Sequence, residues 1–170
     1  MSTREKHKEF LFPCIANYYE KPLVLTKAKG CTVTDEGGAE FLDFFGGILT
    51  LSLGHCNDEV NQAVIDQMKT LGHTSTLYQS EGQVKLAENL AQIAPGELKK
   101  SFFVNSGTEA NETAVVLAKV FTKRHEVIVL RHSYAGRSTF ALNTAGHAPW
   151  RIMESSIPGI KHAHAPYCYR

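Results

Sequence analysis

The chain lacks an excess of charge of either sign. Its 170 residues include 18 lysines and arginines against 17 aspartates and glutamates, which gives a net charge of +1. Nucleic acids and anionic membranes attract proteins largely through basic charge, which a balanced sequence does not supply. We therefore expect no nucleic acid and no membrane partner, and a small molecule as ligand. General disorder is excluded because 43% of the residues are hydrophobic, enough to bury a core.

Paired cysteines and long apolar segments are also missing. The four cysteines are widely spread and form no Cys-x-x-Cys pair, which predicts reduced thiols rather than a disulfide framework. The polar first ten residues do not have the pattern of a secretory signal. The longest uncharged stretches, such as residues 44–57, are too short to span a bilayer. Together these absences predict a cytoplasmic location.

Metal ligands occur without the clustering that a metal site requires. His162, His164 and Cys168 have a spacing similar to that of metal ligands, but no fourth ligand is near them in the sequence. Structural zinc sites need four such ligands. We therefore predict no metal site.

The first hundred residues predict a hairpin followed by two helices. Residues 31–34 and 39–44 alternate in character around an Asp-Glu-Gly-Gly turn, whereas the segment before about residue 29 is expected to be irregular. Apolar residues recur at helical spacing over residues 59–71, with Asn57 or Asp58 as the cap. A second helix is predicted to start at Ser80 and to end at the Pro-Gly pair that follows residue 94.

After residue 100 the pattern changes to alternating strands and helices. We predict a strand at 101–105, a helix at 109–123, a strand at 126–130 and a further helix at 137–144. Strand, helix and strand in this compact order predict a parallel unit with a right-handed crossover. The sequence after Trp150 has no clear periodicity, and no element is predicted there.

The segment Ser106-Gly107-Thr108 lies where the strand at 101–105 gives way to a helix. The first N–H groups of a helix have no partner within it, and the helix dipole adds positive potential, so a phosphate group can bind there. Ser106 and Thr108 add hydroxyl donors, and Gly107 permits close approach of the phosphate. The spacing of Ser106 and Glu109 also fits a capping box, so an ordinary capped helix stays open. The glycine-rich nucleotide motifs are absent.

The run NSGTEANETA from Asn105 to Ala114 resembles the phosphate-binding motif of class III aminotransferases, which are pyridoxal-phosphate enzymes of fold type I. Other pieces match the family in the same order. They are EFLDFFGGI from Glu40, LGH from Leu53, the LAENLA helix, and HSYAGRS from His132. The resemblance extends from about residue 20 to Arg170, so it is more specific than one motif.

The resemblance implies an α/β protein with part of the fold type I architecture. Residues 1–57 would form the N-terminal segment of the small domain, with its hairpin and loop. Residues 58–170 would form the first part of the large domain, with a mainly parallel sheet and flanking helices.

The resemblance also implies a site for pyridoxal 5'-phosphate. Tyr134 matches the aromatic residue that stacks on the cofactor ring, and an aromatic face suits a flat, electron-poor heterocycle. Ala135 stands where the family usually has histidine, so no role is carried over to it. Gly47 and Ile48 match a loop that walls the substrate pocket, with a simple bend as the alternative reading. The cofactor-binding residues implied by the resemblance are Ser106, Gly107, Thr108, Asn111, Tyr134 and Gly136, although Asn111 could equally face solvent.

The catalytic lysine of the family has no counterpart in this sequence. All four aspartates precede the Ser106 segment, so the aspartate that binds the pyridine nitrogen in the family is missing too. After Tyr134 the remaining lysine is Lys161 and the remaining acid is Glu154, and neither has the family's sequence context. We therefore expect an N-terminal part of the enzyme, truncated and inactive alone, with no catalytic residue.

The family resemblance implies transamination as the function of the complete protein. An amino group would pass from an amine or ω-amino acid to a 2-oxo acid, in a homodimer. A decarboxylating transaminase or an aminomutase of the same fold remains open. So does a non-catalytic remnant that binds the cofactor or a partner subunit.

Overall fold

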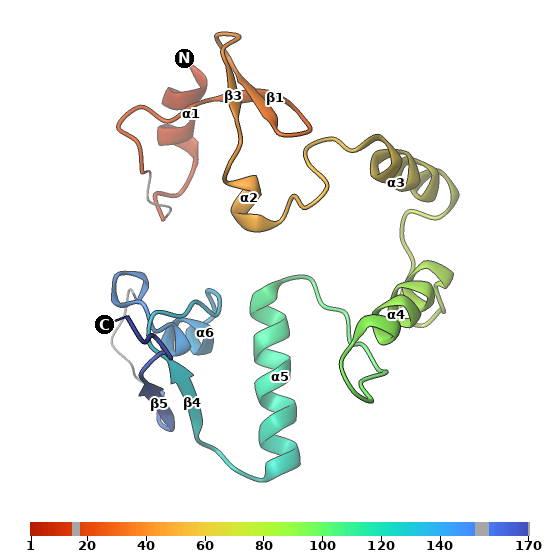
Figure 1. Cartoon of the computed structure of the whole chain (residues 1–170), viewed down its shortest axis with the longest axis vertical. Coiled ribbons are helices and arrows are strands. Elements are labelled where there is room, and N and C mark those ends of the chain that lie inside the picture. Colours follow the sequence, from red (N-terminus) through yellow and green to blue (C-terminus); the bar gives the residue numbers. More distant parts are fainter. Residues whose placement is uncertain (15–17, 152–156, 170) are drawn as a thin grey trace. The chain divides into compact units, whose positions relative to one another are not determined.

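The computed structural model describes residues 1–14, 18–151 and 157–169 (Figure 1). Backbone contacts divide the chain into two compact units, Met1–Ser80 and Glu81–Arg170. The first unit contains a three-stranded antiparallel sheet, and the second contains a pair of parallel strands. The domain boundary that the resemblance implies after residue 57 stays a prediction.

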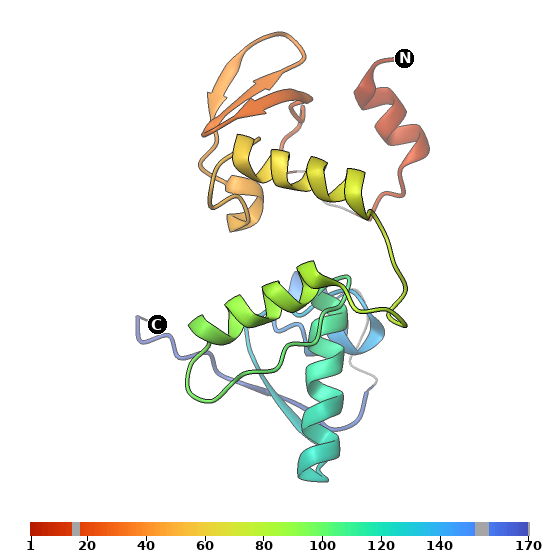
Figure 2. The same ribbon diagram turned by 90° about the vertical axis from the view of Figure 1, so that its right-hand side faces the viewer.

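The predicted hairpin in the first unit is confirmed. Strands β2 (Thr32–Asp35) and β3 (Glu40–Leu42) pair antiparallel, with Val33 opposite Phe41 (Figure 2). A third strand, β1 (Leu25–Lys29), pairs with β2, so the prediction of an irregular segment before residue 29 was wrong. The sequence of β1, LTKAK, has little apolar character, and its pairing with β2 makes it a strand.

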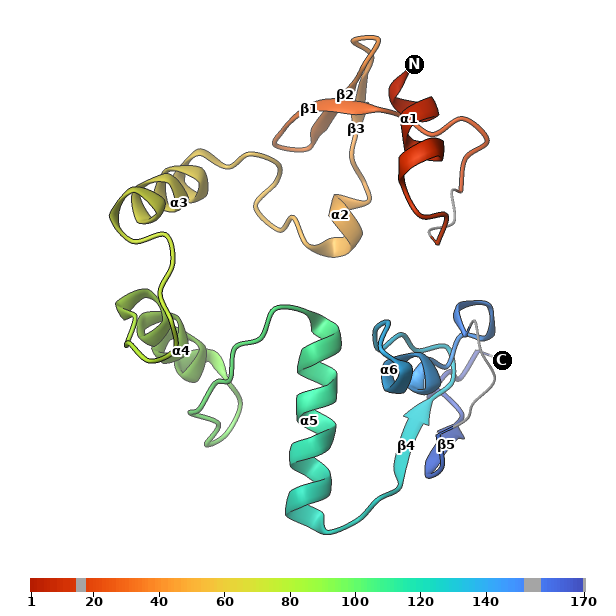
Figure 3. The same cartoon turned by 180° about the vertical axis from the view of Figure 1, so that it is seen from behind.

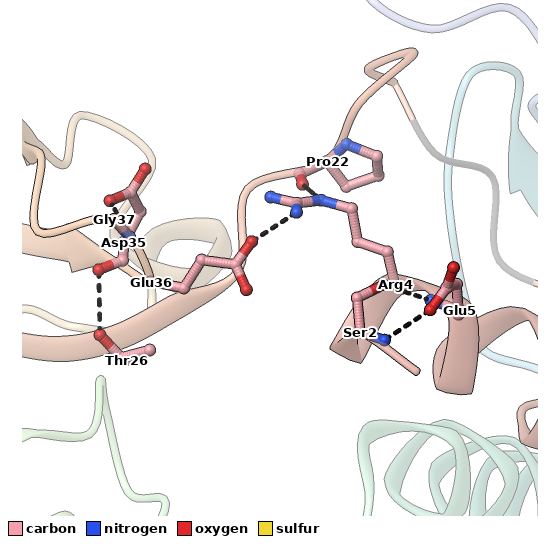
Figure 4. A network of polar contacts seen from close by, with 8 residues as sticks. All are labelled: Ser2, Arg4, Glu5, Pro22, Thr26, Asp35, Glu36 and Gly37. Atoms are coloured by element: carbon pink, nitrogen blue, oxygen red, sulfur yellow. Dashed lines mark hydrogen bonds and ion pairs between the residues drawn. The ribbon is translucent and has the colours of Figure 1, made fainter.

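Helix α1 (Thr3–Phe10) also lies in the segment that was expected to be irregular. It begins with a capping box in which Ser2 and Glu5 bond each other's backbone N–H groups. Arg4 links the helix to the hairpin, because its Nε donates to the carbonyl of Pro22 at 2.8 Å and its guanidinium contacts Glu36 (Figure 4). The helix is thus held by one side chain rather than by a buried face.

The remaining elements of the first unit are a short turn and a helix. Helix α3 (Asp58–Thr70) confirms the helix predicted over residues 59–71, and Asn57 is its cap, with a side-chain oxygen 3.1 Å from the N–H of Val60. The short element α2 (Gly46–Leu49) precedes it.

Unit two contains the helices α4 (Glu81–Ile93), α5 (Gly107–Thr122) and α6 (Thr139–Thr144), and a short 3₁₀ helix at Ala148–Trp150. The three α-helices agree with the predicted ones within a few residues. Strand β4 (Val127–Leu130) matches the strand predicted at 126–130.

The parallel pair of strands that forms is not the predicted one. Strand β4 pairs in parallel with β5 (Ile160–Ala163), and Figure 3 shows α6 beside this pair. The strand predicted at 101–105 is absent, since these residues adopt no regular structure. An apolar segment becomes a strand only when a neighbouring strand accepts its hydrogen bonds, and local sequence does not reveal that neighbour. No element was predicted after Trp150, and β5 shows that this was wrong for residues 160–163.

The composition predicts a buried core, and the core that the structure contains is small. Among the described residues, the buried hydrophobic ones are Val33, Ala141 and Ala145, whereas Phe44 and Phe121 are about nine-tenths exposed. The accessible surface is 14841 Å². Two separate compact proteins, each with half the mass of this chain, would together expose about 10,000 Å² of surface. The chain therefore obtains little hydrophobic stabilisation from its own contacts.

None of the described helices has the length and apolarity that crossing a membrane requires.

Candidate functional site

The N-terminus of α5 is capped and still has free donors. Ser106 has an extended backbone, and its Oγ accepts a hydrogen bond from the N–H of Glu109 at 3.2 Å. The carboxylate of Glu109 accepts from the N–H of Asn105 at 2.7 Å, so this half of the predicted capping box reaches one residue further back. Within the described residues, the N–H groups of Gly107 and Thr108 have no acceptor, as is usual for the first turn of a helix.

This set of donors fits a phosphate group. An atom placed at the Cβ position of Gly107 would meet nothing within 4 Å, so no other segment crowds this glycine on that side. The hydroxyls of Ser106 and Thr108 each accept one backbone hydrogen bond, and each retains its own proton to donate. Two amides, two hydroxyls and the positive end of the helix dipole therefore occur together at this helix start.

The loop after β4 is bonded directly to the first turns of α5. The side-chain amide of Asn111 donates to the carbonyl of Ala135 at 2.8 Å. The hydroxyl of Thr108 accepts from the N–H of Arg137 at 3.2 Å. Asn111 therefore contacts the loop, which excludes the reading of a residue that only faces solvent.

A third contact extends this attachment to α6. The hydroxyl of Ser138 bonds the carboxylate of Glu112, and the same hydroxyl accepts from the N–H of Ala141 at 3.0 Å as the cap of α6. One serine therefore joins α5 to the first turn of α6. The sequence pattern did not indicate Glu112 or Ser138 as members of the site, although Glu112 belongs to the motif that follows Ser106.

Gly136 is required by its contact with Thr108. Its φ is +128°, a region that L-residues rarely adopt, and an added Cβ would lie 2.3 Å from Thr108 Oγ1 and 3.0 Å from Thr108 Cα. The loop and the helix start thus approach too closely for any side chain at this position. The structure brings together Thr108, Asn111 and Gly136, which the sequence had singled out separately.

Tyr134 lies in the same loop and is 57% exposed. Its ring is perpendicular to that of Trp150, with the centroids 5.5 Å apart, and the centroid of the His147 ring lies 4.5 Å from that of Trp150. The exposed ring leaves area for stacking on a second flat ring. Trp150 and His147 were not predicted as neighbours of Tyr134. The single tryptophan of the sequence was the signal available, but its distance along the chain gave no reason to place it here.

Gly47 and Ile48 belong to the first unit, in α2. Four successive residues from Gly46 to Leu49 have φ between +56° and +64°, so α2 is a left-handed helical turn rather than a simple bend. Such a conformation costs about 1–2 kcal/mol for each residue other than glycine, and a β-branched residue such as Ile48 is unusual in it. Strained backbone of this kind tends to occur at functional sites.

Lys161 lies on strand β5, which corrects the expectation that it sits in a loop. It lies 3.9 Å from Glu126 and is well exposed. Together with Arg124, His125 and Ile128 these residues line an open cavity of about 620 Å³ beside the parallel strands. No contact joins Lys161 to the Ser106–Thr108 segment in the described residues.

Comparison with known proteins gives consistent matches. A family model described as Aminotransferase class-III matches residues 14–170. The mitochondrial alanine–glyoxylate aminotransferase 2 homolog 2 of Arabidopsis thaliana is 38% identical over 167 residues, which cover 97% of this chain and 34% of that protein. An acetylornithine aminotransferase of Methanothermobacter thermautotrophicus is 37% identical over 151 residues, covering 88% of this chain and 38% of that protein. The chain thus spans little more than a third of these curated relatives.

Solved structures agree with the sequence matches. An ω-transaminase of Pseudomonas jessenii, solved in complex with PMP, superposes with a TM-score of 0.88 and 25% identity, over 100% of this chain and 40% of its own. A (S)-enantioselective ω-transaminase of Thermomicrobium roseum superposes with a TM-score of 0.86 and 30% identity, over 98% of this chain and 40% of its own.

Proposed function

The chain belongs to the class III aminotransferases, which depend on pyridoxal 5'-phosphate and have fold type I, and from this premise we propose that it provides the phosphate-binding and ring-binding part of a transaminase. The observation that carries the proposal is the start of α5, where two N–H groups without an acceptor among the described residues occur together with two hydroxyls. The amino group would pass from an amine or ω-amino acid to a 2-oxo acid.

The residues of the second unit would divide the binding of the cofactor between them. Ser106, Gly107 and Thr108 would donate hydrogen bonds to its phosphate, and the ring of Tyr134 would stack on its heterocycle. Asn111 would act through the backbone, by fixing the carbonyl of Ala135 beside Tyr134. When bound, the cofactor supplies an electron sink and carries the amino group between the two substrates.

The proposal also concerns the catalytic lysine, which these 170 residues do not supply. Lys161, the one lysine of the sequence after Tyr134, does not have the family's sequence context, so we propose that this chain alone has no transaminase activity. In the protein made from the complete reading frame we propose a homodimer. Gly47 and Ile48 would border the substrate in that protein.

The test is a titration with pyridoxal phosphate that is followed by absorbance. The spectrum is recorded before and after treatment with borohydride, and peptide mass mapping then locates any fixed adduct. We expect saturable binding that inorganic phosphate reverses, and no adduct fixed on residues 1–170. Thr108→Val should weaken binding about tenfold or more, since a hydrogen bond to a charged group is lost. An adduct fixed on Lys161 would contradict the absence of a catalytic lysine, and unaltered affinity in Thr108→Val would contradict the phosphate site.

A matched control is available at the other end of the same helix. The hydroxyl of Thr122 bonds the carbonyl of Ala118 at 2.8 Å, away from the start of α5. Thr122→Val therefore removes an equivalent hydroxyl from α5 and should leave the affinity unchanged.

A further inference from the structure

One carboxylate binds the start of the left-handed turn α2, and the hydroxyl of Thr50 donates to the carbonyl of Gly47 within the turn at 2.7 Å. Asp43 Oδ1 accepts hydrogen bonds from the N–H of Phe45 at 2.8 Å and from the N–H of Gly46 at 2.9 Å. The turn closes on itself where the N–H of Thr50 donates to the carbonyl of Gly46 at 2.9 Å. Asp43 therefore satisfies the first donors of a turn that begins in an unfavourable conformation.

The second oxygen of the same carboxylate is bound by a histidine. Asp43 Oδ2 lies 2.7 Å from His55 Nε2, and the two side chains are only 15% and 21% exposed. A carboxylate oxygen can only accept, so Nε2 carries the proton and donates. The N–H groups of Gly46 and Phe45 and the His55 side chain lower the pKa of Asp43 below its usual value, which keeps it ionised.

His55 is fixed in turn by the strands. Its N–H donates to the carbonyl of Gly30 at 2.8 Å, and its carbonyl accepts from the N–H of Gly30 at 2.9 Å. The N–H of Asp43 donates to the carbonyl of Cys31 at 2.8 Å. Both members of the Asp43–His55 pair are thus anchored by their backbones to the β1–β2 connection, and their side chains extend this anchor to the turn.

We propose that Asp43 and His55 are positioning residues that fix the left-handed turn at Gly47 and Ile48 and thereby shape the wall of the substrate pocket. The part concerning substrate rests on the proposed function, whereas the part concerning the turn rests on the contacts alone. The contacts of Asp43 and His55 described above all lie within the first unit, whereas the proposed cofactor-binding residues belong to the second. Loss of the pair should therefore change the recognition of the amino donor without changing the binding of pyridoxal phosphate.

The charged and titratable groups around the pair are few. Lys29 on β1 donates to the carbonyl of Cys56 at 2.8 Å and to the carboxylate of Asp58 at 2.5 Å, so its charge is paired beside His55. Cys31 and Cys56 are the thiols next to the two backbone anchors, and both are exposed. Apart from their bond to each other, Asp43 and His55 have no bond to a charged side chain among the described residues.

The first arm of the test measures the turn itself by amide hydrogen exchange and by the backbone coupling constant of Ile48, in the protein made from the complete reading frame. His55→Ala should speed exchange at Phe45 and Gly46 at least tenfold and shift the coupling constant of Ile48 toward right-handed values. Asp43→Asn, which keeps one acceptor oxygen, should have a smaller effect of the same sign. Unaltered exchange in both variants overturns the proposal.

The second arm measures kinetics. In His55→Ala, the KM for the amino donor should rise about tenfold while kcat changes less than threefold and the affinity for pyridoxal phosphate is unchanged. A loosened turn with an unchanged KM overturns the role in the substrate pocket but leaves the turn contacts valid. If the unmodified protein does not bind pyridoxal phosphate, that result would instead overturn the proposed function.

His73→Ala is the control for removal of an imidazole from the same unit. His73 is exposed, lies between α3 and α4, and bonds no other described residue. It should alter neither exchange at Gly46 nor KM. If His55→Ala fails to fold, His55→Gln keeps a side-chain donor and is expected to restore most of the protection at Phe45 and Gly46, and failure to do so overturns the hydrogen-bonding role.

Discussion

The starts of α5 and α2 solve the same physical problem in opposite ways. At α5 the N–H groups of Gly107 and Thr108 have no acceptor among the described residues, and the cap beside them is a neutral hydroxyl. At α2 the N–H groups of Phe45 and Gly46 are occupied by the carboxylate of Asp43. A helical start that already holds an internal anion is closed to an external one, whereas a start capped by a neutral serine can still bind a phosphate.

The largest effect on cofactor binding is expected when a carboxylate is placed at the start of α5, as Asp43 is at the start of α2. Ser106→Asp keeps an efficient cap, because aspartate is as good an N-cap as serine. Its negative charge should lower the affinity for pyridoxal phosphate about 100-fold, since it removes a donor and repels the phosphate. Titration and thermal unfolding together check this, with the free energy of unfolding expected to change by less than about 0.5 kcal/mol. Equal affinity in the variant would indicate that Ser106 only caps the helix.

The next effect concerns the approach of the loop to α5. Gly136→Ala places a Cβ 2.3 Å from Thr108 Oγ1, so either the loop or the hydroxyl must move. We expect a loss of stability of about 1–3 kcal/mol, by thermal or denaturant unfolding, and cofactor affinity reduced roughly tenfold.

Gly82→Ala is the matched control for this change. Gly82 lies within α4, and an added Cβ there meets nothing within 4 Å. Alanine should raise the free energy of unfolding by up to about 1 kcal/mol, because glycine is unfavourable inside a helix. A similar loss in both variants would show that the contact with Thr108 is not the cause.

A smaller effect of opposite sign is expected in α2. Ile48 is 70% exposed and has a φ of +62°, so Ile48→Gly removes strain and little buried surface. The free energy of unfolding should rise by about 0.5–1 kcal/mol, as measured by denaturant titration. Ile65→Gly in α3 should lower it by a similar amount, because there the backbone is right-handed and regular. Destabilisation by both changes would argue against strain at Ile48.

The smallest effect is the response of α2 to acid. The folded pKa of Asp43 is lowered from 3.8, so its contribution to stability is complete above that value and is lost as the pH falls through the lower, folded pKa. Exchange at Phe45 and Gly46, corrected for intrinsic rates, should therefore be constant near neutral pH and rise in this acidic range. Asp43→Asn should abolish the dependence, and its persistence there would assign it to another group.

The sequence was most informative where local chemistry decides the structure. Asn57 and Ser106 are caps because a side-chain oxygen next to the first turn of a helix bonds an N–H that would otherwise lack a partner. The motif around Ser106 and the aromatic Tyr134 were likewise recognisable as short runs. The strand predicted at 101–105 failed because strand formation depends on a neighbour that the local pattern does not contain.

By itself, the sequence indicated the helices α3 to α6, the hairpin of β2 and β3, the family and the motif around Ser106, since each depends on residues within a few positions of one another. Only the tertiary structure decided that Asn111, Thr108 and Glu112 hold the Tyr134 loop, that Trp150 contacts Tyr134, and that β5 pairs with β4. It also revealed the Asp43–His55 pair and the left-handed turn. These features depend on backbone segments that lie far apart along the chain and meet only when it folds, so no local spacing could indicate them.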